Sequence, residues 1–184
     1  MLRIELVGHM DAGDRKLWTA DQDSRPLTAT GQQQAARLAE ELCFEPFEAI
    51  YSSPALRCHQ TAAPVAARFG LPVISLEELR ETDGYMLPDG WQDSRAAAPV
   101  ALGAAYAAGR ALAALRIIRA NVPSGRVLVC SHGDILPVLM ALLRGSEGLE
   151  FPAPLEQRGG WETLMIEGDH IEIYQHSLIE NFPA

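Results

Sequence analysis

The sequence predicts an α/β protein, a three-layer α/β/α sandwich with a mostly parallel central sheet. Strand patterns alternate with helix patterns along the chain, which is typical of a parallel sheet covered by helices. Two strands, far apart in sequence, each end in a loop that carries a histidine. The 184 residues, 48% of them apolar, are enough for one domain with a substantial core. We therefore expect a single domain over residues 1–184, with an insertion or lid at about 77–95.

The strands are predicted from short apolar patterns. Leu2, Ile4 and Leu6 alternate with polar residues, and Gly8 ends this first strand just before His9. The other predicted strands cover residues 47–51, 71–74 and 126–130, and a final hairpin covers 161–167 and 170–175, with its turn at 168–169.

Four helices are predicted between these strands. Ser52-Ser53-Pro54 is a start signal, with a serine cap and proline at the first helical position, and Gly70 ends the same helix. Thr28 or Thr30 caps the helix before it. The alanine-rich helix is expected to be interrupted near two glycines. The predicted helices cover residues 31–42, about 54–69, 96–120 and 135–143, and the two glycines are Gly103 and Gly109.

Two long polar segments lie at the carboxyl ends of the strands, where α/β proteins bind ligands. Residues 10–28 and 77–95 are too long for plain connections, and such loops usually carry function. We expect them to form the mouth of a pocket that suits an organic group larger than a triose. The aromatic and apolar residues that would line it are Trp18, Tyr85, Met86 and Trp91.

Composition excludes several classes of partner. A net charge of −9 argues against nucleic acid, whose phosphates require clustered basic residues. The odd number of cysteines, without metal-type spacing or a signal peptide, indicates the cytoplasm. We find no apolar run of membrane-spanning length in the sequence pattern and expect no membrane partner. The apolar hairpin is a candidate sheet edge, and edges that pair are a common route to dimers, so a homodimer is one of the expected alternatives.

Three candidate groups follow strand ends and are expected to converge on one rim: His9, Arg57 and His132. A histidine can act as a nucleophile that accepts a phosphoryl group. An arginine and a second histidine can hold the oxygens on which charge gathers during phosphoryl transfer. Glu81 would supply a carboxylic acid that protonates the leaving alcohol and later activates water.

Plainer interpretations exist for each residue alone. A loop histidine is more often hydrogen-bonded to backbone than catalytic, and a lone arginine or glutamate is usually solvated. His59, His170 and His176 are expected to be structural or exposed. Of the three, His59 is the best candidate to line the cleft, because it lies in the same helix as Arg57. A metal hydrolase is a loose third alternative. Its ligands would be His9, Asp11, His132 and Asp134.

Four ordered segments resemble the histidine phosphatase superfamily, which has the phosphoglycerate-mutase-like fold. The resemblance runs from about residue 3 to 140, and four motifs in order are far more specific than one. It is closest to small bacterial members of the family. The segments are Leu6-Val7-Gly8-His9 with Arg25-Pro26-Leu27-Thr28, Tyr51-Ser52-Ser53-Pro54 with Arg57, Leu79-Arg80-Glu81, and Cys130-Ser131-His132-Gly133.

The resemblance implies a cofactor-independent phosphatase without a metal. His9 becomes the nucleophile that forms phosphohistidine, and Arg57 and His132 form the phosphate pocket. Glu81 becomes the proton donor, although this position varies in the family and Glu78 lies close by. The substrate would be a phosphorylated small molecule, a nucleotide or a phosphoprotein bearing phosphohistidine. A mutase is disfavoured because the chain is short.

One position departs from the family pattern. The family has Arg-His-Gly or Arg-His-Ala, whereas this chain has Gly8-His9-Met10. Loss of a preorganised donor typically costs on the order of 10²–10³ in rate. Arg15 or Arg25 is a candidate to compensate, and Met10 is expected to crowd the phosphate. The alternative function is therefore a catalytically weakened module that binds a phosphorylated ligand.

Overall fold

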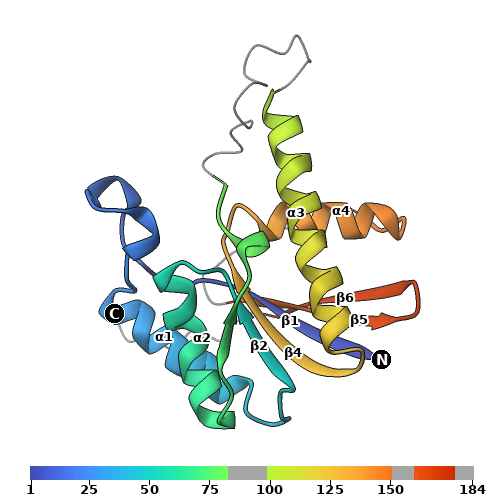
Figure 1. The fold of residues 1–184 in the computed structure, drawn as a ribbon, viewed down its shortest axis with the longest axis horizontal. Coiled ribbons are helices and arrows are strands. Elements are labelled where there is room, and N and C mark those ends of the chain that lie inside the picture. Colours follow the sequence, from blue (N-terminus) through green and yellow to red (C-terminus); the bar gives the residue numbers. More distant parts are fainter. Residues whose placement is uncertain (83–98, 151–159, 177–184) are drawn as a thin grey trace.

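The computed structural model describes residues 1–82, 99–150 and 160–176. Their strands form a six-stranded sheet in the order β3-β2-β4-β1-β5-β6 (Figure 1). The pairings among β1, β2, β3 and β4 are parallel, and those that join β5 and β6 are antiparallel. The strands are β1 (Leu2–Gly8), β2 (Ala49–Ser52), β3 (Val73–Ser75), β4 (Gly125–Ser131), β5 (Trp161–Glu167) and β6 (His170–His176). The predicted mostly parallel sheet and its final hairpin are confirmed.

Helices cover both faces of this sheet, as the three-layer prediction requires (Figure 1). Helices α1 and α2 share one buried apolar cluster with the sheet, and α3 and α4 share the other. The helices are α1 (Ala29–Glu41), α2 (Leu56–Phe69), α3 (Pro99–Asn121) and α4 (Leu136–Ser146). Three short 3₁₀ turns lie in the loops: η1 (Arg15–Leu17), η2 (Gln22–Ser24) and η3 (Glu77–Leu79).

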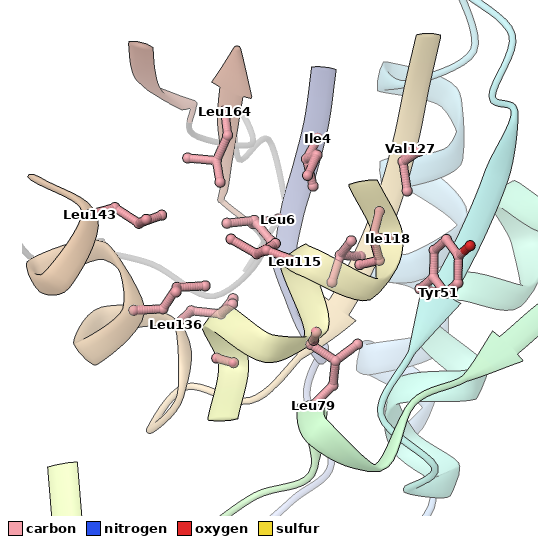
Figure 2. Packing of buried hydrophobic residues seen from close by; sticks show 14 of the residues in the cluster. Ile4, Leu6, Tyr51, Leu79, Leu115, Ile118, Val127, Leu136, Leu143 and Leu164 are labelled. Atoms are coloured by element: carbon pink, nitrogen blue, oxygen red, sulfur yellow. The ribbon is translucent and has the colours of Figure 1, made fainter. Parts of the chain in front are cut away.

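Alternation along β1 distributes its side chains between the two cores. Ile4 and Leu6 pack with Leu115 of α3 in the first cluster, as Figure 2 shows. Val7 points to the opposite face and belongs to the cluster under α1 and α2. Because side chains alternate between the faces of a strand, one apolar strand serves both layers.

The polar side of β1 is not exposed as its pattern suggests. Glu5 is completely buried. Its carboxylate accepts a hydrogen bond from Arg126 Nε at 2.9 Å and another from the Thr163 hydroxyl. Arg126 comes from the neighbouring β4, so this buried charge is compensated by an ion pair.

Helix α2 begins later than predicted and without a serine cap. Its N-cap is Ala55, which makes no side-chain hydrogen bond to the helix. The serines before it turn toward other partners, described below. The predicted end is confirmed, because Gly70 adopts the left-handed conformation that closes a helix (φ 67°).

Helix α3 is continuous, so the predicted interruption at Gly103 and Gly109 is wrong. Its stretch Ala101–Asn121 is also long and apolar enough to cross a membrane, by length and composition only, contrary to the expectation from the sequence. One face of the helix, which includes Ala111, Leu115 and Ile118, is buried against the sheet and α4. Packing against the core therefore accounts for the apolar residues of this face, and 39% of the stretch is buried.

Candidate active site

The site lies where three adjacent parallel strands end. In the sheet β4 lies between β2 and β1, so His132, which follows β4, lies between Ser53 and His9. Backbone pairing continues past the strand ends: His9 N donates to Ser131 O at 2.9 Å, and Ser53 N donates to Cys130 O at 2.9 Å. The carboxyl edge of the sheet thus fixes the backbone of all three residues.

His9 is half-buried, and its hydrogen bonding defines which ring nitrogen can react. Nδ1 lies 2.7 Å from the carbonyl oxygen of Met10. Since a carbonyl only accepts, we assign the proton to Nδ1, which leaves the lone pair on Nε2. The rings of His9 and His132 meet edge-on, with centroids 5.5 Å apart. His9 therefore has the tautomer of an Nε2 nucleophile.

Met10 does not crowd this site. The structure buries its side chain completely among residues of α1 and α2. Its backbone N–H donates to Thr61 Oγ1 at 3.0 Å, and that hydroxyl donates to the carbonyl of Arg57 at 2.8 Å. The large residue after His9 thus anchors the loop to α2, and the predicted steric conflict is wrong.

Arg57 is completely buried in the first turn of α2, which aims it into the site. Nη1 donates to the Gln22 carbonyl at 2.6 Å. Nη2 donates to Glu81 Oε2 at 2.6 Å and lies 3.2 Å from His132 Nδ1. Within the described residues its buried Nε has no hydrogen-bond partner. The arginine therefore links the histidine pair to the predicted acid and retains a donor for a ligand.

His132 is buried and neutral. Arg57 can only donate, so His132 Nδ1 accepts, and Nε2–H donates to Ser53 Oγ at 2.8 Å. The thiol of Cys58 lies 3.5 Å from the same Nε2. Burial first, and then the charges of Arg57, His9, Arg110 and Arg25, lower the pKa of His132 to about 2. His132 thus contributes a neutral ring to this pocket.

Glu81 lies at the far end of this group. Its carboxylate contacts Arg57 at 2.6 Å and Arg15 Nη1 at 3.6 Å, and 18% of its side chain is exposed. The structure therefore brings together His9, Arg57, Glu81 and His132, with Arg15 beside them. This arrangement can offer arginine charge to an anionic group on one side and an imidazole on the other.

Arg25, the other candidate compensating arginine, hydrogen-bonds to the loop that carries it. It is buried, and its Nη1 donates to the carbonyls of Ala12 and Gly13 at 2.8 and 3.1 Å. Its Nε donates to Gln22 Oε1 at 3.2 Å. These bonds tie the two ends of the 10–28 loop together. Of the two candidate compensating arginines, Arg15 contacts Glu81, and the charge of Arg25 contributes to the lowered pKa of His132.

The remaining histidines contact residues outside this group. His59 is half-buried, and its Nε2 lies 2.7 Å from Oγ of Ser75, the last residue of β3. A place for His59 at the cleft stays a prediction. His176 stacks on Trp161, with ring centroids 4.8 Å apart, and His170 is exposed. No group of three or more His, Cys, Asp or Glu in the described ranges is arranged to hold a metal ion.

Of the residues predicted to line the pocket mouth, the structure describes Trp18. Trp18 is half-exposed, and its indole N–H donates to the Asp21 carbonyl at 2.9 Å. The expected mouth residues Tyr85, Met86 and Trp91 lie outside the described residues.

Sequence reasoning missed several residues that contact this group. Ser53 is hidden in a motif that also predicts a helix cap, and Gln22 contributes only its backbone carbonyl. Asp134 follows His132 by two residues, and its spacing from the histidines indicates only a candidate metal ligand. Arg110 has no local signal, since it lies in an alanine-rich helix whose pattern indicates packing alone.

Comparisons with known proteins agree with this geometry. The histidine phosphatase superfamily (branch 1) matches residues 8–177. The 8-oxo-(d)GTP phosphatase of Mycolicibacterium smegmatis is 27% identical over 137 residues, which cover 74% of this chain and 36% of that protein. An uncharacterised protein of Mycobacterium tuberculosis is 38% identical over 76 residues, 38% of each chain. The chain thus spans less than half the length of these curated relatives.

Solved structures share the whole architecture. YhfR of Bacillus stearothermophilus superposes with a TM-score of 0.71 at 21% identity, covering 94% of this chain and 95% of that one. A mycobacterial glucosyl-3-phosphoglycerate phosphatase superposes with a TM-score of 0.69 at 21% identity, covering 96% and 98%. At this identity the likeness establishes the phosphoglycerate-mutase-like fold.

Proposed function

The chain belongs to the histidine phosphatase superfamily, branch 1, and from this premise we propose that it hydrolyses a phosphomonoester or phosphohistidine through a phosphohistidine intermediate on His9. One observation carries the proposal. An unbroken series of contacts runs from His9 through His132 and Arg57 to Glu81, so an imidazole, a buried guanidinium and a carboxyl group lie in one group. This is the set of groups that phosphoryl transfer through a nucleophilic side chain requires.

The proposed reaction has two steps. Nε2 of His9 attacks phosphorus, a P–N bond forms, and the P–O bond to the leaving group breaks while protonated Glu81 gives its proton to that oxygen. Water then attacks phosphorus and returns a proton to Glu81, and the P–N bond breaks to release inorganic phosphate. Arg57 lies against the developing negative charge in both steps, and the mechanism needs no cofactor.

The substrate stays at the level of a class: a phosphorylated small molecule, a nucleotide or a phosphoprotein. The names of the relatives support small phosphorylated metabolites and nucleotides, because they include an 8-oxo-(d)GTP phosphatase and a glucosyl-3-phosphoglycerate phosphatase. We place Arg15 and Trp91 among the substrate-binding residues. We also propose a cytoplasmic location, since the three cysteines are free.

A second candidate function rests on Gly8. The chain lacks the arginine that the family has beside the nucleophile, so the site is proposed alternatively as a weakened module that binds phosphorylated ligands. In that case the pocket of Arg57 and His132 would bind a phosphate without turnover.

Hydrolysis of p-nitrophenyl phosphate in the presence of EDTA separates these functions. We expect the parent to be active and His9→Ala to lose at least about a hundredfold in kcat, because the nucleophile is absent. His170→Gln is the control, since that histidine is exposed and lies far from the carboxyl ends of β1, β2 and β4. A parent as inactive as His9→Ala would reject the phosphatase and favour the binding module.

A further inference from the structure

Three side chains, from β4, from α3 and from the turn before α4, bind the backbone on both sides of Glu81. Ser131 Oγ, at the end of β4, donates to the carbonyl of Leu79 at 2.8 Å. Arg110 Nη2, from the middle of α3, donates to the carbonyl of Arg80. Asp134 Oδ2, just before α4, accepts from the backbone N–H of Thr82 at 3.2 Å and from its hydroxyl at 3.4 Å.

These contacts hold a segment that has little regular structure of its own. The last element before Glu81 is the short turn η3, which ends at Leu79. A segment without helix or strand bonds depends on side chains to fix its backbone. Bonds in which one partner is charged are about twice as strong as neutral ones, and two of the three anchors, Arg110 and Asp134, are charged.

The two charged anchors are partly withdrawn from water, which costs free energy unless contacts compensate it. Arg110 is half-buried. Burial, followed by the nearby carboxylate of Glu81, raises the pKa of Asp134. The charge of Arg110 also contributes to the lowered pKa of His132, so this side chain lies close to the histidine pair.

We propose that Asp134 and Arg110 are positioning residues that fix the backbone on either side of Glu81 and so aim its carboxyl group at the leaving oxygen. The inference rests on the proposed phosphatase function. Neither residue needs to touch the substrate, because each acts through the peptide groups next to the acid. A displacement of about 1 Å in a catalytic group can cost about 10²-fold in rate, so such anchors matter.

The test compares two esters that differ in their need for an acid. The anion of p-nitrophenol leaves readily without a proton, whereas the alkoxide of glycerol phosphate requires one. The quantity measured is kcat/KM, which reports transfer of the phosphoryl group to His9. The variants are Asp134→Ala, Asp134→Asn and Arg110→Gln. Asp169→Asn and Arg116→Gln are matched controls at exposed positions, the latter on the same helix.

We expect Asp134→Ala and Arg110→Gln to lower kcat/KM for glycerol phosphate by about 10–100-fold and that for p-nitrophenyl phosphate by less than about threefold, since an acid contributes about 10²–10⁴. Asp134→Asn should retain most activity, because its amide oxygen still accepts from the Thr82 N–H. Arg110→Gln carries the test alone if Asp134→Ala does not fold.

An equal loss on both esters would overturn the proposal, because it would indicate general structural damage, and so would no loss on either. If the parent hydrolyses p-nitrophenyl phosphate through His9 and the variants give either of these two results, only the positioning role is rejected. A parent that hydrolyses neither ester would reject the phosphatase and this inference together.

Discussion

At the scale of single residues, the position before His9 determines whether an arginine stands beside the proposed nucleophile. Gly8 is the last residue of β1, in extended backbone, and its Cα is paired with that of Ser131. Among the described residues, a Cβ added there would meet only the Leu136 Cδ1, at 4.0 Å. The backbone at Gly8 therefore has room for a Cβ. A steric conflict at the Cβ does not explain why this chain has glycine where the family has arginine.

Gly8→Arg is expected to raise kcat/KM for p-nitrophenyl phosphate by at least about tenfold, because a single preorganised donor is typically worth about 10²–10³ in rate. Arg15, which already contacts Glu81, would supply part of that charge in the parent and reduce the gain. Gly8→Ala is the control that adds a Cβ without charge. An arginine variant no faster than the alanine variant would show that the missing charge is not limiting.

Ser53→Ala is expected to lower the free energy of unfolding by about 1–3 kcal/mol, because it removes the oxygen that accepts from the buried His132 Nε2–H. Urea unfolding gives the value. Ser75→Ala is the matched control, since Ser75 also contacts a histidine, His59, but is exposed. Equal effects of the two substitutions would argue against a special cost for the buried pair.

The sequence predicted the site residues whose signal is local and left out those whose contacts are not. His9 and His132 each follow a recognisable strand, and Arg57 follows a turn, so order along the chain indicates their meeting. The local sequence does not distinguish between Arg15 and Arg25 as compensating arginines, because the position of each side chain depends on the path of a long loop. Arg110 contacts the Arg80 carbonyl across 30 positions, and no pattern in α3 indicates it.

At the scale of elements, the start of α1 supports the loop after His9. Thr28 caps α1, and its hydroxyl also contacts the Asp11 carboxylate at 2.6 Å. The Asp11 backbone N–H donates to Gln34 Oε1 at 3.0 Å. Asp11 lies so close to the helix that a Cβ on Gly31 would stand 2.0 Å from the Asp11 carbonyl oxygen. Glycine is therefore required at this contact.

Gly31→Ala is expected to lower the free energy of unfolding by about 1–3 kcal/mol through overpacking, and to lower activity by displacing the loop next to His9. Gly109→Ala in α3 is the matched helical glycine. No atom of the described residues lies within 4 Å of its added Cβ, so Gly109→Ala should raise the free energy of unfolding by about 0.4–1 kcal/mol. Two variants of equal stability would contradict the close contact at Asp11.

The errors in predicting elements share one physical cause. Serine and proline after β2 are a valid cap signal, but Ser53 instead hydrogen-bonds His132, and the helix begins at Leu56. The glycines of α3 weaken a helix locally, yet burial of its alanine and leucine face outweighs that preference. Tertiary contacts decided both cases, and they are not visible in a short window of sequence.

At the scale of the whole molecule, folding keeps His132 in its neutral form. The residue ends up fully buried at the middle of the sheet edge, between β1 and β2. Burial and the Arg57 charge lower its pKa from 6.5 to about 2. Between these values the unfolded chain binds one proton more at this histidine than the folded chain does. Stability from this group is therefore complete above about pH 6.5 and is lost as the pH falls.

The predicted slope is about 1.4 kcal/mol per pH unit between pH 6.5 and the onset of acid unfolding, which corresponds to one proton. Asp134 and Glu162 act in the opposite direction, since burial raises the pKa of both carboxyl groups. Comparison with His132→Gln isolates the histidine, because the carboxyl groups are common to both proteins. Urea unfolding from pH 4.5 to 7.5 should show the parent losing stability faster than the variant on acidification. His170→Gln, which changes an exposed histidine, should follow the parent. Parallel curves for the parent and His132→Gln would mean that the buried histidine takes up its proton without unfolding, which would contradict a neutral His132 between Arg57 and Ser53.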